Sequence, residues 1–162
     1  MLDYSIVPVP TEFPVPPVNC IIIFNEPLTI IDPGIRREKT RNLLEQALQV
    51  RGKTLKDVQR IILTHGHIDH FGISGDLNRQ YGTPVYIHKD DMGKILSASR
   101  EHTAGGMKEI LLMHGVPEKD LVHIDSFMHK SDELIAPLDQ AEPLGESIDF
   151  ENESLRVIHS PG

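Results

Sequence analysis

Three histidines and one aspartate lie within six consecutive positions of this chain. The stretch ILTHGHIDHFG, residues 62–72, contributes His65, His67, Asp69 and His70. Imidazole and carboxylate groups together bind zinc, iron or manganese, and the stretch has no cysteine of the kind that builds structural zinc sites. A single histidine is usually a surface residue, but three histidines beside an aspartate at the end of an apolar segment favour a metal site.

The spacing of these side chains indicates how they could be shared between metals. His65 and His67 point to the same side if the chain is still extended there, because side chains alternate along a strand. Gly66 allows the backbone to turn tightly, so Asp69 and His70 can point elsewhere. One short loop could therefore feed two adjacent metal positions.

The elements that must position this loop alternate between strands and helices. Apolar β-rich segments predict strands at 6–10, 18–24, 28–31, 60–64, 84–88 and 154–160, and apolar residues at helical spacing predict helices at 37–50, 73–82, 89–97 and 107–115. Prolines place the first strand at a sheet edge, and we expect residues 125–148 to be mostly turns. This order predicts an α/β protein with the histidine loop at the end of the 60–64 strand, where such folds place their sites.

Composition narrows the class of protein. Hydrophobic residues make up 39 % and charged residues 25 % of the chain, which is typical of a folded domain rather than a disordered segment. A net charge of -8 argues against nucleic-acid binding, which requires basic residues. The first ten residues lack the pattern of a signal peptide, and the longest apolar run, 20–24, is too short for a membrane span. We therefore expect a soluble cytoplasmic protein, and its single cysteine, Cys20, excludes an internal disulfide.

Several motifs together resemble one known family. THGHIDHFG resembles the HxHxDH signature of the metallo-β-lactamase superfamily. NCIIIF and LTIIDPG resemble the family's opening hairpin and its Asp-x-Gly turn, and VIHSPG resembles a later motif that precedes a ligand histidine. The resemblance spans residues 18–162 and implies an αβ/βα sandwich, most similar to glyoxalase II.

The resemblance also implies a role for each site residue. His65 and His67 would bind a first divalent metal, and Asp69 and His70 a second. Zinc is the first expectation, with iron or manganese as alternatives, and the nucleophile would be a hydroxide bridging the two metals. Asp69 would be the catalytic residue that orients this nucleophile and relays a proton. Asp32 would accept a hydrogen bond from a ligand histidine, although an ordinary turn before Pro33 would also explain an aspartate there.

Further ligands of the family would follow Gly162. We therefore expect residues 1–162 to form one incomplete domain, the first half of the sandwich plus the start of the second, with partial or no metal occupancy. Such a domain would leave one sheet face uncovered, which a homodimer could bury. We expect His88 at the rim of the site and His159 to be a structural residue on the last strand.

The function implied by the resemblance is metal-dependent hydrolysis of a small ester or thioester, with a small molecule as the partner. Activity is expected to be impaired in residues 1–162 alone. Two alternatives stay open at this point. One is a non-catalytic fragment or metal-binding module, and the other is an iron-dependent persulfide oxygenase of the same superfamily.

Overall fold

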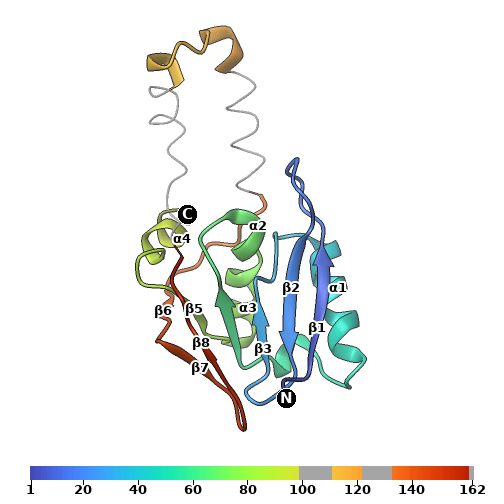
Figure 1. Cartoon of the computed structure of the whole chain (residues 1–162). Coiled ribbons are helices and arrows are strands. Elements are labelled where there is room, and N and C mark those ends of the chain that lie inside the picture. The colour runs from blue at the N-terminus through green and yellow to red at the C-terminus, as the bar shows by residue number, and fades with distance from the viewer. Residues whose placement is uncertain (99–110, 122–132, 161–162) are drawn as a thin grey trace.

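A six-stranded sheet forms the centre of the molecule in a computed structural model that describes residues 1–98, 111–121 and 133–160 (Figure 1). Its strands lie side by side in chain order: β1 (Tyr4–Val9), β2 (Val18–Ile23), β3 (Thr29–Ile31), β4 (Arg60–Leu63), β5 (Val85–Ile87) and β6 (Glu142–Pro143). The first three strands are antiparallel, and β3 to β6 are parallel. The predicted α/β class and the hairpin of 18–24 with 28–31 are therefore confirmed.

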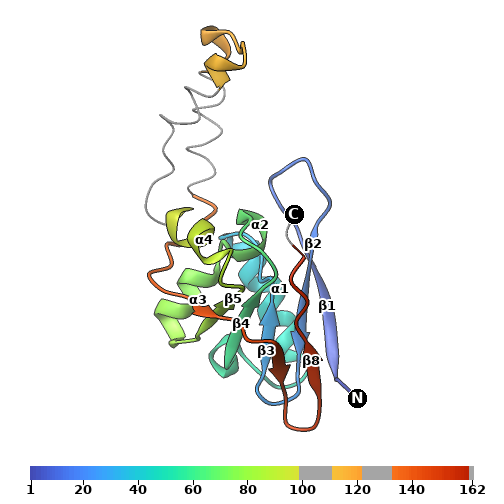
Figure 2. The same ribbon diagram turned by 60° about the vertical axis from the view of Figure 1, so that its left-hand side comes forward.

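Helices and a second hairpin lie on opposite faces of this sheet (Figure 2). The labelled helical elements are α1 (Glu38–Gln49), η1 (Leu55–Asp57), α2 (Ile68–Phe71), α3 (Ser74–Tyr81) and α4 (Met92–Ala98), and the hairpin consists of β7 (Ser147–Asp149) and β8 (Ser154–Arg156). Residues 111–113 and 118–121 are also helical. In β4, Ile61 belongs to the core that includes the α1 and α3 side chains, whereas Ile62 lines a cavity beneath the hairpin. This alternation follows from the two-residue period of a strand.

Burial of one helix face holds α1 on the sheet. Leu44 and Leu48, four residues apart, are fully buried and join Ile30 and Ile61 in one core. Each such side chain contributes about 1.5–3 kcal/mol when it leaves water. At the C-terminal end of α3, Gly82 adopts a left-handed conformation with φ of 73° and ends the helix, as its sequence position predicts.

One sequence prediction is wrong at the C-terminal end of the described chain. The predicted strand 154–160 ends at Arg156, and beyond it the Val157 N–H donates to the Glu146 carbonyl at 2.8 Å. Residues 125–132 lie outside the described part of the chain, and residues 133–148 are mostly turns and irregular segments as expected, with β6 and the start of β7 among them. The proline in β6 is tolerated because β6 is an edge strand. Part of the predicted helix 107–115 lies outside the described residues.

Within the described ranges, every helix is too short or too polar to cross a bilayer.

Candidate metal centre

The histidine loop begins where β4 ends and closes into the short helix α2. His67 precedes α2 with an extended backbone, φ -84° and ψ 145°, and the chain becomes helical at Ile68. The loop is anchored from below because the backbone N–H of Asp32 donates to the carbonyl of Ile62 at 3.0 Å. Gly72 fixes the far side of α2, since a Cβ there would clash with the backbone oxygen of Leu134. The loop is thus positioned by the C-terminal end of β4 and by the close approach of Gly72 to the Leu134 backbone.

The three histidine rings of the loop converge. His65 Nε2 lies 3.0 Å from His67 Nδ1, and the rings of His65 and His70 have centroids 4.0 Å apart. Burial lowers the pKa of His65, and the neighbouring His70 and His67 lower it further. A lowered pKa keeps the imidazole neutral near pH 7, and the neutral form is the one that binds metals.

Asp32 holds the centre together from beneath. It is only 5 % exposed and has a positive φ of 52°. Its carboxylate accepts hydrogen bonds from the Thr64 N–H at 2.8 Å and the Thr64 hydroxyl at 2.6 Å, and lies 2.9 Å from His70 Nδ1. An ionised carboxylate only accepts, so His70 Nδ1 carries the proton and Nε2 is left with its lone pair.

The acidic groups also act on the charge of His70. Burial lowers the pKa of His70, but the hydrogen bond to Asp32 and the charges of Asp32 and Asp69 outweigh that effect, so the pKa is raised. Nε2 of His70, which holds a lone pair in the neutral ring, lies 3.9 Å from an Asp69 oxygen. His70 and Asp69 therefore face each other across a gap that is too wide for a hydrogen bond.

These spacings fit a divalent metal. Two donors on one tetrahedral ion lie about 3.4 Å apart, because each bond is about 2.0–2.2 Å long. The separations of 3.0 Å for His65 and His67 and 3.9 Å for Asp69 and His70 lie on either side of that value. Asp32 also has an oxygen within 4.8 Å of ligand atoms of His65 and His70, but its oxygens already accept three bonds, so it positions His70. Ligation by the four loop residues stays a prediction.

A cavity of about 590 Å³ opens beside the loop. Its polar wall includes His65, His67, His88, Asp91, Lys94 and His159, and its apolar wall includes Ile31, Ile62, Leu144, Ile148, Val157 and Ile158. His88 thus lies in the wall of the cavity that the histidine loop opens onto. Sequence reasoning missed Asp91 and Lys94, whose side chains lie 2.6 Å apart at the start of α4. The only available signal was the pair of acidic residues directly before the predicted helix.

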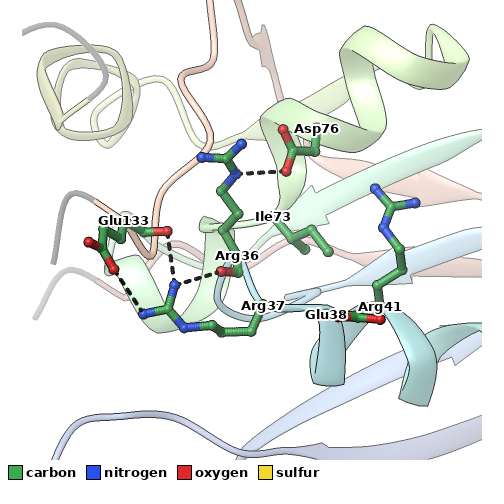
Figure 3. Close-up of a pocket in the computed structure, with 7 residues that line it drawn as sticks. All are labelled: Arg36, Arg37, Glu38, Arg41, Ile73, Asp76 and Glu133. Carbon is green, nitrogen blue, oxygen red and sulfur yellow. Dashed lines mark hydrogen bonds and ion pairs between the residues drawn. The ribbon is translucent and has the colours of Figure 1, made fainter. Parts of the chain in front are cut away.

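A second cavity, of about 390 Å³, is lined by none of the four loop residues (Figure 3). Arg36, Arg37 and Arg41 line it, but Arg36 pairs with Asp76 at 2.9 Å and Arg37 lies 3.7 Å from Glu133. Because carboxylates already neutralise two of the three arginines, we assign no substrate to this cavity.

Comparison with known proteins decides the family. The family model of the metallo-beta-lactamase superfamily matches residues 14–162. The chain belongs to this superfamily. A metallo-beta-lactamase family protein from Thermus thermophilus shares its fold, with a TM-score of 0.83 and 28 % identity over 98 % of this chain and 52 % of that protein.

Other superfamily members extend the comparison. The hydroxyacylglutathione hydrolase GloC of Haemophilus influenzae is 26 % identical over 150 residues, covering 89 % of this chain and 56 % of that protein. The metallo-beta-lactamase GOB-18 of Elizabethkingia meningoseptica shares the fold with a TM-score of 0.61 at 19 % identity, over 90 % of this chain and 46 % of its own. The chain thus spans about half the length of the relatives that it matches along most of its sequence.

Proposed function

We propose that the complete protein containing these residues hydrolyses a small ester or thioester in a metal-dependent reaction. The observation that carries the proposal is the placement of Asp32, which holds the proton of His70 on Nδ1 and leaves Nε2 facing Asp69. Such buried support for a histidine is typical of metal centres. An acyl substrate is further supported by the likeness to a hydroxyacylglutathione hydrolase.

The chain's own residues would share the work as follows. His65 and His67 would hold one metal, and Asp69 and His70 a second. When bound, such metals supply Lewis acidity and lower the pKa of water. The Asp69 oxygen that does not bind the metal would orient the attacking water and pass a proton to the leaving group. The apolar wall of the cavity, which includes Ile62 and Ile148, would pack against the acyl chain.

A hydrolysis assay tests this proposal. The complete protein, loaded with Zn²⁺, should hydrolyse an acyl-glutathione thioester or p-nitrophenyl acetate, and His67→Ala should lower kcat/KM by at least ~100-fold, more than the loss of a supporting group. The exposed His114, which lies outside the loop, provides the control variant His114→Ala. Full activity in His67→Ala would refute the role of the loop.

A further inference from the structure

A second group of ligand-type side chains lies at the rim of the large cavity, formed by residues from distant parts of the sequence. His88 directly follows β5, Asp90 lies two residues later, and His159 follows β8. The two imidazole rings are stacked, with centroids 3.6 Å apart and an interplanar angle of 13°. Ligand atoms of all three residues lie within 4.8 Å of one another.

The distances within this group are those of a chelate rather than of hydrogen bonds. One Asp90 oxygen, Oδ2, lies 3.6 Å from His88 Nδ1 and 4.0 Å from His159 Nδ1. Hydrogen bonds between such groups are about 2.7–3.2 Å long. Two ligand atoms of one tetrahedral zinc ion lie about 3.4 Å apart, given bonds of about 2.0–2.2 Å. The ligand atoms are thus close to chelate spacing, and binding one ion would also require the two stacked rings to tilt apart, because an imidazole nitrogen donates its lone pair in the plane of its ring.

The hydrogen bonds of Asp90 and His88 leave Asp90 Oδ2 and His88 Nδ1 available to bind a metal. The other carboxylate oxygen of Asp90, Oδ1, accepts a hydrogen bond from Lys89 Nζ at 3.2 Å, so Oδ2 is the oxygen that faces the histidines. The backbone N–H of Asp90 donates to His88 Nδ1 at 3.4 Å. That long bond identifies Nδ1 as the atom with the lone pair, and a metal could replace so weak a contact.

We infer that His88, Asp90 and His159 bind a divalent first-row cation, with Zn²⁺ the best match for two imidazoles and one carboxylate. Three protein ligands would leave one coordination position open, the arrangement of sites that exchange a water or another small ligand. Solvent can reach the group, because Asp90 is 54 % exposed at its side chain. The inference does not depend on the proposed hydrolase function, since the four loop ligands form a separate set.

The competing explanation is a stacked histidine pair that one carboxylate holds by charge alone. Such a pair would join the start of α4 to the segment after β8 without binding any ion. Zinc titration separates the two explanations, because only the chelate requires Asp90 and His159 for metal binding.

The test uses chain 1–162 stripped of metal with a chelator and titrated with Zn²⁺ in a calorimeter. Asp90→Asn changes an exposed side chain and should preserve the fold, which circular dichroism checks. We expect it to weaken one class of zinc site by at least ~100-fold, since ligand loss exceeds the 10–100-fold typical of supporting groups. His67→Ala should leave this class intact, and His114→Ala should match the wild-type protein.

A nuclear magnetic resonance titration gives an independent readout with His88, Asp90 and His159 all unchanged. The imidazole signals of His88 and His159 should shift together as one equivalent of Zn²⁺ is added to the His67→Ala variant. The inference is overturned if these signals do not move, or if Asp90→Asn and His159→Ala both bind zinc as the wild-type protein does. If the complete protein hydrolysed no ester or thioester while the His88 and His159 signals still shifted with zinc, the result would count against the proposed function only.

Discussion

Replacing Asp32 by asparagine changes the chemistry beneath the metal centre while keeping its shape. In the native chain the carboxylate accepts from the Thr64 N–H and hydroxyl and from His70 Nδ1. In Asp32→Asn the remaining oxygen can still accept from the Thr64 N–H. The new amide nitrogen then faces the Thr64 hydroxyl and His70 Nδ1 as a donor, so His70 must move its proton to Nε2. Nε2 is the atom that the proposed site needs free.

The size of both effects follows from these contacts. Asparagine tolerates the positive φ of 52° at position 32, so the backbone adds little strain. Hydrogen bonds to a charged group are worth about 1.5–3 kcal/mol, and the Thr64 hydroxyl can rotate to recover part of the loss. We expect the free energy of unfolding of the metal-free chain to fall by about 1.5–3 kcal/mol. Metal affinity should fall about 10–100-fold, as for other residues that orient a ligand histidine.

The assay combines urea unfolding of the metal-free variant with Zn²⁺ titration of the folded protein. Asp139→Asn, the same change at an exposed position, should alter neither quantity and serves as the control. If Asp32→Asn lost stability but bound zinc at the loop site as tightly as the native chain, Asp32 would be a turn residue only. Unchanged stability and unchanged affinity would refute the whole account of the position.

Three other predictions concern the fold. Gly72→Ala should lower the free energy of unfolding by at least ~2 kcal/mol because its Cβ would meet the Leu134 backbone oxygen, whereas Gly93→Ala in open space should cost nothing; equal denaturation midpoints would contradict this. Leu44→Ala should cost about 2–5 kcal/mol by leaving a cavity under α1, measured by urea unfolding; a loss below ~1 kcal/mol would mean that α1 is not packed as described. Burial raises the pKa of the Cys20 thiol, so thiolate formation should be suppressed as pH rises to about 9, and iodoacetamide should label only the unfolded chain; labelling of the native chain at the rate of a free thiol would show that Cys20 is accessible.

The order of elements could be read from the sequence where local pattern and tertiary environment agree. Helix α1 has its apolar residues on one face, so helical spacing located it, and β4 is short, apolar and buried, so its apolar β-rich run located it. The histidine loop could also be predicted from the sequence, because its four ligand-type residues lie within six consecutive positions. Asp32 was identified through the likeness of DPG to a family turn, and the structure adds the hydrogen bonds that give it a physical role.

Features that depend on distant residues could not be predicted in the same way. Strand β8 ends at Arg156, although the apolar residues Val157 and Ile158 follow it, because the extent of a strand depends on its pairing with a partner strand. The approach of His159 to His88 depends on how the β7–β8 hairpin crosses the sheet, and no local pattern encodes that path. Asp91 is buried beside Lys94, which local pattern could not indicate because a charged residue before a helix usually faces solvent.

The most direct test of the metal centre is anomalous diffraction from crystals of the complete protein soaked in zinc. We expect anomalous density within about 2.0–2.2 Å of His65 and His67 and a second peak at the same distance from Asp69 and His70. Asp32 should remain hydrogen-bonded to His70 and should not touch either ion. Ordered zinc elsewhere in the molecule, with these four side chains free of metal, would contradict the account.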